Sequence, residues 1–535
     1  MVGVPGRSKG CNTCIQRRIK RICGGYTRKT IYVFSEDVHL KQQDVQEDDR
    51  TVIFHGRAKV SDRQVKFSTN DKSGSLASKN PLIWSGPSPT ASSSTSSPPH
   101  RSDVEQRLDI LAAGRFTNIS VNWHQLHHIF LSTYMPKAGL GTTSKSETQV
   151  DGNWLLQLQG GVINSPALQT SVAAYAAAHL AHERNNRALV QQSREMYMRS
   201  LEHLRIALSK KRTRLSDETL AACLALSMYE LAESPAAGVE GAENSIKAAN
   251  GYTTHLMGAM MLMELRGPDM NNSPLAHSLF LGLRRYMLLG SLMNHKDTFI
   301  SHPQWRERPW AVYPKNLLDV CLDALFEMPA VLRQWDAVSH ESNDAVIQHK
   351  CAAILDRCNE LDADLQNWYV EYEQSWSGPL YQTAFCTLKS QFDNDELGKV
   401  FPISYHFPVF TIGYVLITYW SGMMVVHNIA MAAQYKLAYV ASMSPSGTLS
   451  ACAAAKEHTD IWLDMVRNMC QSVEYFMGQE TGRIGPTTAM GIMQGCMASL
   501  SGEPELWGRE QGWIVEMMGR IGKRLNLPRH DILWK

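Results

Sequence analysis

The stretch THLMGAMMLMELRGP, residues 254–268, is the clearest guide to the fold class of this chain, because it is typical of a helix with a defined end. Its apolar residues recur three or four positions apart, as they do along one face of an α-helix. Gly267 can adopt the left-handed conformation that closes a helix, and Pro268 cannot continue one. The stretch therefore predicts a helix that ends at Arg266.

Upstream of that stretch, the sequence shows two clear helix starts. Ser165 is a hydroxyl cap followed by proline, which is tolerated at the first helical position. Ser216 is a second cap, and Asp217 and Glu218 follow it where the positive end of the helix dipole favours carboxylates. Strand-like alternation is scarce. We therefore expect a mainly α protein with a large all-α helical domain over residues 104–535.

Composition and charge divide the chain into three parts. Its 535 residues are 44% hydrophobic and 19% charged, which is a globular composition for a chain too long for one compact core. Residues 1–30 carry eight Lys or Arg and no acid, which leaves −6 for the remainder once they are taken from the net +2. Residues 85–99 are Ser, Thr, Pro, Gly and one alanine, a composition that cannot bury a core. We expect a basic arm over residues 1–30 and a flexible linker over residues 31–103.

The cysteines indicate a reducing compartment. There are 11, an odd number, and no apolar secretory segment follows Met1, so secretion is not expected. Eight of them are scattered through apolar, helix-like segments, where we expect free buried thiols: Cys223, Cys321, Cys351, Cys358, Cys386, Cys452, Cys470 and Cys496.

One apolar run is long enough to raise the question of a membrane span. No Asp, Glu, Lys or Arg lies between Lys399 and Lys436, and residues 407–433 are largely apolar. About 20 apolar residues suffice to span a bilayer. No positive cluster flanks the run, so we interpret it as a buried core helix and expect no membrane partner.

The basic arm contains a cysteine motif that resembles a known DNA-binding module. Cys11 and Cys14 are separated by two residues, a spacing that lets two thiolates bind one tetrahedral zinc ion, and basic residues follow at once. This resembles the binuclear zinc cluster of fungal transcription factors, in which six cysteines share two zinc ions and a short basic helix enters the major groove. Cys23, followed by Gly-Gly-Tyr, is similar to the last cysteine of that module.

The arm departs from the family pattern in its number of ligands. Arg21 stands where the resemblance places the third cysteine, and the fourth and fifth cysteines have no counterpart. Three thiolates do not hold two zinc ions, and one tetrahedral site requires a fourth ligand, for which His39 is the nearest candidate. Small zinc modules are unfolded without metal, so we expect this arm to bind DNA more weakly and less specifically than a complete cluster.

The resemblance assigns roles to individual residues of the arm. It implies that Cys11, Cys14 and Cys23 are zinc ligands. Lys20 matches the base-contacting lysine of the family, and Arg17 and Arg18 match its phosphate contacts, which position a protein on DNA without reading the sequence. The DNA partner implied by the family contains CGG-type half-sites.

Four further pieces of the chain resemble the helical regulatory domain that accompanies such clusters in one large fungal family. They are His255-Leu256-x-Gly258-Ala259-x-x-Leu262-x-x-Leu265-Arg266-Gly267-Pro268, Pro303-x-Trp305 with Trp310, Tyr419-Trp420 ahead of His427, and residues 471–476, QSVEYF.

The resemblance implies a zinc-dependent, sequence-specific regulator of RNA polymerase II genes in the nucleus, with DNA and the transcription machinery or co-regulators as partners. It leaves homodimerisation open, since no sustained heptads are present. The alternative is an interaction module that no longer binds DNA and competes with intact relatives.

Other motifs carry less weight. His124, His127 and His128 form one group at helical spacing, and His179, His182 and Glu183 form another. Either group could offer metal ligands on one helix face, but we expect helix-surface or capping roles for both. The chain has no His-Glu-x-x-His, Gly-x-Ser-x-Gly or dinucleotide-binding pattern, so we expect no enzyme. The cluster of methionines around Met260 is interpreted as core filling, with an adaptable ligand pocket as the alternative.

Overall fold

The computed structural model describes residues 119–137, 152–159, 163–233, 242–440, 445–501 and 507–525. Side chains are described from residue 125 onward, except those of residues 242–250 and 445–454. The chain divides into two units, residues 1–100 and 101–535, and every described residue belongs to the second. The domain boundaries near residues 30 and 103 lie outside the described residues and stay predictions.

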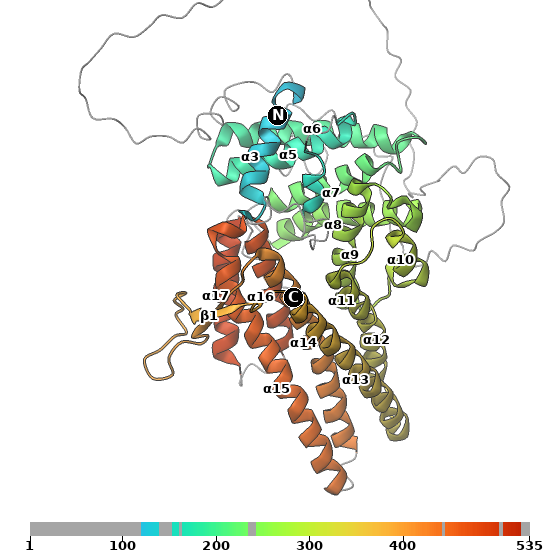
Figure 1. The fold of residues 1–535 in the computed structure, drawn as a ribbon, viewed down its shortest axis with the longest axis vertical. Coiled ribbons are helices and arrows are strands. Elements are labelled where there is room, and N and C mark those ends of the chain that lie inside the picture. The colour runs from blue at the N-terminus through green and yellow to red at the C-terminus, as the bar shows by residue number, and fades with distance from the viewer. Residues whose placement is uncertain are drawn as a thin grey trace, which may run out of the picture. The chain divides into compact units, whose positions relative to one another are not determined.

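The described part of the chain is mainly helical, as the sequence predicts (Figure 1). Its first helices are α3 Ile119–Tyr134, α4 Asn153–Leu156, α5 Pro166–Glu183, α6 Arg187–Ser209, α7 Asp217–Ala232 and α8 Ala242–Arg266. They are followed by α9 Pro274–Asn294, α10 Pro303–Glu307, α11 Leu317–Leu325, α12 Met328–Ser339 and α13 Asp344–Gln374. The last are α14 Phe410–Val440, α15 Pro445–Phe476, α16 Ile484–Leu500 and α17 Gly508–Leu525.

The helix ends follow the caps read from the sequence. The Ser165 side chain accepts a hydrogen bond from the backbone N–H of Leu168 and begins α5, and Ser216 begins α7 in the same way. Helix α8 ends at Arg266, where Gly267 takes a φ of +78°. This φ is costly for any residue with a Cβ, so the glycine fixes the end of the helix.

The two strands within the described ranges form a small antiparallel hairpin. Strand β1, Gln382–Phe385, pairs with β2, Ile403–His406. Strand β2 packs on α15, whereas β1 is exposed along its whole length and leaves the Phe385 side chain 89% accessible. This hairpin was not predicted from the sequence, because strands of four residues are too short to show alternation.

Helix α14 is the helix predicted from the apolar run. It begins two residues after Pro408 and packs along α13 and α15 (Figure 1). By length and composition it could cross a membrane, but 67% of its most apolar window is buried inside the described fold. In this unit it serves as a core helix.

The cysteines of the described side chains agree with the sequence prediction. Seven are free and buried: Cys223, Cys321, Cys351, Cys358, Cys386, Cys470 and Cys496. Cys386 follows strand β1 instead of lying in a helix, and the side chain of Cys452 lies outside the description.

Candidate effector pocket

The residues predicted to bind zinc and DNA lie outside the described residues. These are Cys11, Cys14, Arg17, Arg18, Lys20 and Cys23. Within the described ranges, no group of three or more His, Cys, Asp or Glu is placed to hold a metal ion. The site that the structure does describe is a pocket in the helical unit.

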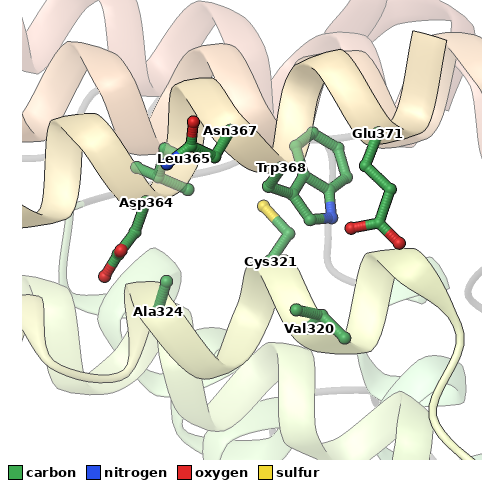
Figure 2. Close-up of a pocket in the computed structure, with 8 residues that line it drawn as sticks. All are labelled: Val320, Cys321, Ala324, Asp364, Leu365, Asn367, Trp368 and Glu371. Carbon is green, nitrogen blue, oxygen red and sulfur yellow. The ribbon is translucent and has the colours of Figure 1, made fainter. Parts of the chain in front are cut away.

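This pocket lies between α11 and α13 and has a volume of about 320 Å³ (Figure 2). Helix α11 contributes three residues and α13 contributes five: Val320, Cys321, Ala324, Asp364, Leu365, Asn367, Trp368 and Glu371. The volume is at the lower end of the range typical of small-molecule sites.

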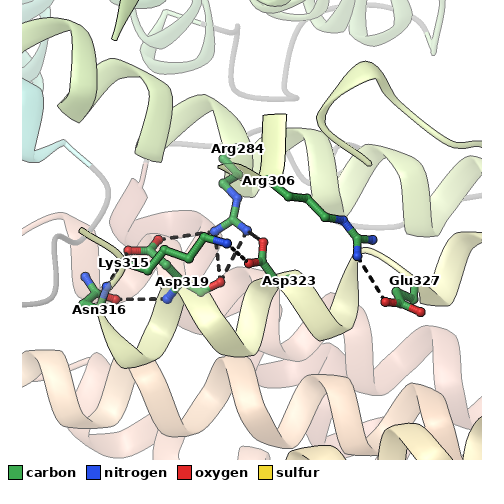
Figure 3. Close-up of polar contacts among 7 residues, drawn as sticks. All are labelled: Arg284, Arg306, Lys315, Asn316, Asp319, Asp323 and Glu327. Atoms are coloured by element: carbon green, nitrogen blue, oxygen red, sulfur yellow. Dashed lines mark hydrogen bonds and ion pairs between the residues drawn. The ribbon is translucent and has the colours of Figure 1, made fainter. Parts of the chain in front are cut away.

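Buried charge holds the α11 wall in place. Arg284 of α9 is only 1% exposed, and its guanidinium donates to the Asp319 backbone oxygen and to a carboxylate oxygen of Asp319, each at 3.3 Å (Figure 3). It also pairs with Asp323, which in turn accepts from Lys315 at 2.5 Å. Two cations thus balance two carboxylates at the contact of α9 with α11.

The start of α11 is fixed by the same carboxylate. Asn316 caps the helix by accepting from the backbone N–H of Asp319 at 3.0 Å, and Asp319 accepts from the backbone N–H of Asn316 at 3.3 Å. This reciprocal pair is a capping box. Burial raises the pKa of Asp319, while the Arg284 charge opposes the rise. Asp319 therefore fixes both the start of α11 and its contact with α9.

Aromatic packing holds the α13 wall. Trp368 is buried, and its indole N–H donates to the Leu317 backbone oxygen of α11 at 2.6 Å. Its ring stacks on Tyr372 at a centroid distance of 5.2 Å and on Tyr419 of α14 at 5.5 Å. Since both walls are fixed by buried contacts, the pocket is a preformed feature of the fold.

The pocket contains no reactive nucleophile. Cys321 is 1% exposed, and burial raises the pKa of its thiol to about 12. The thiol is therefore protonated at neutral pH, and a protonated thiol is neither a good nucleophile nor a metal ligand. The lining can bind a ligand through apolar contact and charge.

A second polar group lies where α13, α14 and α15 meet. The buried His427 lies between Asp362, whose carboxylate is 3.2 Å from Nε2, and His458, whose Nδ1 is 3.0 Å from the Nδ1 of His427. Burial and the neighbouring His427 lower the pKa of His458. Burial tends to raise the pKa of Asp362, but hydrogen bonds from His427 and Gln366 bring it below its usual value. This arrangement joins three helices.

The histidine groups noted in the sequence differ from the predicted surface or capping roles. His179 is fully buried, and its Nε2 lies 2.9 Å from the Thr133 hydroxyl, while His127 is 3% exposed. Burial lowers the pKa of His179 well below its usual value. The surface interpretation was wrong for His179 because α5 is buried around most of its circumference, and for His127 because its ring lies against the buried Phe130 of α3. His182 pairs with Glu233 at 2.8 Å, and His128 is exposed.

The pocket residues Asp364, Trp368 and Glu371 were not predicted from the sequence. Their spacing of four and then three residues places them on one face of α13, which a helical projection would have shown. Arg284 could also have been noticed, because it is an arginine inside an apolar helical run. However, neither the spacing on α13 nor this arginine shows which helix packs against α13.

Comparison with known proteins places part of the chain in a family context. Residues 125–326 match the family described as "Fungal specific transcription factor domain". The family is one of transcription regulators, and the match covers less than half of the 535 residues. It contains the α11 wall of the pocket and ends before α13.

Two of the four sequence pieces that resemble the helical regulatory domain, at residues 255–268 and 303–310, fall inside the matched range. The pieces at residues 419–427 and 471–476 lie beyond it, as does the cysteine arm. The family resemblance is therefore supported for α3 to α11.

Among curated proteins, the uncharacterized protein AN5342 of Emericella nidulans is 25% identical over 163 residues. That alignment covers 30% of this chain and 32% of the relative, so the two share about a third of their length. No solved structure matches the chain.

Proposed function

We propose that this chain is a nuclear transcription regulator of RNA polymerase II genes that contacts DNA through residues 1–30. The observation that carries the proposal is the match of residues 125–326 to a fungal transcription factor domain, in a chain that also has a basic cysteine arm. The helical unit acts by recruiting partners such as co-regulators. Chemical catalysis has no part in this mechanism.

Within the arm, the proposed contacts fall into two kinds. Arg17 and Arg18 neutralise phosphates, which gives affinity that falls steeply with salt. Lys20 reaches a base edge and supplies the preference for a CGG-type half-site. Phosphate contacts alone position the arm without reading the sequence.

Zinc is the cofactor that the arm motif implies, with Cys11, Cys14 and Cys23 as ligands. The donor set falls short of the family's requirement, because three thiolates do not complete even one four-ligand site. Zinc bound by this arm would order the basic segment. The contacts to DNA proposed above come from the basic side chains themselves.

The second candidate is an interaction module that does not read DNA and competes with intact relatives for partners. Arg21, at the place of the third cysteine, favours this candidate. An incomplete cluster leaves the basic segment unsupported, and the helical unit would then supply the whole function.

A gel-shift titration of the full chain separates the two candidates. It uses one duplex with CGG half-sites and one with these scrambled, each with and without added zinc, and zinc per chain is measured by mass spectrometry. Zinc-dependent preference for the CGG duplex supports the first candidate. Binding that ignores sequence, or no binding, supports the second.

Arm variants refine the same measurement. Lys20→Ala is expected to remove about 1–3 kcal/mol of discrimination between the duplexes. Arg17→Ala is expected to weaken binding to both duplexes equally and to reduce the salt dependence by about one phosphate contact. Lys29→Ala, which lies past Cys23, is the matched control with a smaller effect.

A further inference from the structure

The pocket between α11 and α13 has a carboxylate at each end. Asp364 lies at one end and Glu371 at the other, with Trp368 and Cys321 between them (Figure 2). No hydrogen bond or ion pair links either carboxylate to any other side chain of the described residues. Both residues are exposed, so their carboxylates stand in solvent at the two ends of a partly apolar pocket.

The spacing of these carboxylates sets the length of a ligand that can reach both of them. Asp364 and Glu371 are seven residues apart on one face of α13, so their backbones are separated by about 10 Å along the helix axis. A single metal ion requires ligands within about 2–3 Å, which this separation excludes. A ligand that pairs with both carboxylates therefore needs two separate positive groups.

The wall between the carboxylates is mostly apolar. Val320 and Ala324 of α11 face Leu365 and Trp368 of α13 across the pocket. The Cys321 thiol, 1% exposed, is directed into this space and makes no hydrogen bond in the described fold (Figure 2). A ligand that fits has methylene groups in its middle section and a donor that can approach sulfur.

We propose that this pocket binds a linear aliphatic polyamine, a dication or trication of about the length of spermidine. Its terminal ammonium groups pair with Asp364 and Glu371, and its methylene chain covers Val320, Ala324 and Trp368. Ammonium–carboxylate hydrogen bonds are charge-assisted and gain strength beside apolar surface. A compact cation cannot reach both carboxylates, and an anion is repelled by both.

This inference is independent of the DNA-binding role proposed for the arm. The pocket consists of residues of the helical unit alone. Failure of DNA binding would leave the polyamine site standing, and failure of polyamine binding would leave the arm's role standing.

The test is isothermal titration of the full chain with spermidine at low ionic strength. We expect saturable binding at one site per chain. Butylamine, with one charge, and Mg²⁺, with two charges on one centre, are expected to bind at least tenfold more weakly. Equal binding by butylamine would overturn the proposal, as would the absence of any heat at millimolar spermidine.

Variants locate the site. Asp364→Asn and Glu371→Gln are each expected to weaken binding about fivefold, and the double variant to abolish it. Ala324→Leu, which fills the apolar wall, is expected to weaken binding without changing charge. Glu373→Gln is the matched control, since it lies on α13 outside the pocket and has no partner among the described side chains.

The Glu373→Gln control distinguishes binding of spermidine in the pocket from general attraction of spermidine to an acidic surface. If Glu373→Gln weakens spermidine binding as much as Glu371→Gln does, the pocket is not the site and the proposal is wrong. Thermal unfolding of each variant shows whether it is folded, and the two carboxylate variants are expected to unfold at the same temperature as the parent chain.

Discussion

Helices α11 and α13 each carry two carboxylates near the pocket, and they use them in opposite ways. Asp319 and Asp323 of α11 pair with Arg284 and Lys315 and are part of the packing between helices. Asp364 and Glu371 of α13 have no partner in the described fold. The difference teaches that the carboxylates of α11 stabilise the packing of helices, whereas those of α13 are exposed and accessible to a ligand.

The largest effect is expected from removing Arg284, the buried cation that pairs with the carboxylates of α11. Arg284→Met leaves Asp319 buried beside Asp323 without Arg284, and a broken buried ion pair costs about 3–5 kcal/mol. We expect a loss of this size in the free energy of unfolding, measured by chemical denaturation. The control is Arg333→Met, which breaks the exposed pair with Asp297 and should cost less than about 1 kcal/mol. Equal losses in the two variants would show that the Arg284 pairs add nothing to the fold.

An intermediate effect is expected from lowering the pH, which protonates His277 near the Arg284 guanidinium. His277 of α9 is 5% exposed and lies against Trp310, whose ring also lies 5.2 Å from the Arg284 guanidinium carbon. Burial lowers the pKa of His277 from 6.5 to about 4. The unfolded chain therefore binds the proton first, and the stability that His277 contributes is complete above pH 6.5 and is lost as the pH falls toward 4.

At pH 5 this loss amounts to about 2 kcal/mol. The measurement is the unfolding midpoint at pH 7 and pH 5 for the parent and for His277→Phe, which cannot titrate. The variant should lose less stability than the parent over this interval. An identical loss in both would assign the pH dependence to other groups, such as His458, whose pKa is also lowered by burial.

The smallest effect is expected from removing a carboxylate of the α13 wall. Glu371→Gln removes an exposed charge that has no hydrogen-bond or ion-pair partner among the described residues, so the free energy of unfolding should change by less than about 0.5 kcal/mol. Asp319→Asn is the matched variant on α11, where the same exchange of oxygen for amide should cost more than about 1 kcal/mol. A large loss in Glu371→Gln would show that this carboxylate serves the fold after all.

Local features of the fold were predictable, and long-range ones were not. The caps at Ser165 and Ser216 and the stop at Gly267 act within a few residues, so the sequence alone identifies them. The burial of His179 depends on α3, which contributes Thr133 and Phe130 from more than 40 positions away. No local pattern carries that information.

The candidate site shows the same limit. A helical projection places Asp364, Trp368 and Glu371 on one face of α13, but a face becomes a pocket only when another helix lies opposite. Helix α11 takes that place because Trp368 donates to Leu317 and Arg284 pairs with Asp319. These partners are about 35 to 50 residues apart, beyond the reach of periodicity.

The sequence by itself determined that the chain has a basic cysteine arm and a helical domain, because charge, ligand spacing and helix caps are properties of neighbouring residues. Tertiary structure alone decided which carboxylates are neutralised. Whether Asp323 or Glu371 pairs with a cationic side chain depends on which helices pack together. That packing is determined by the burial of apolar surface across the whole unit.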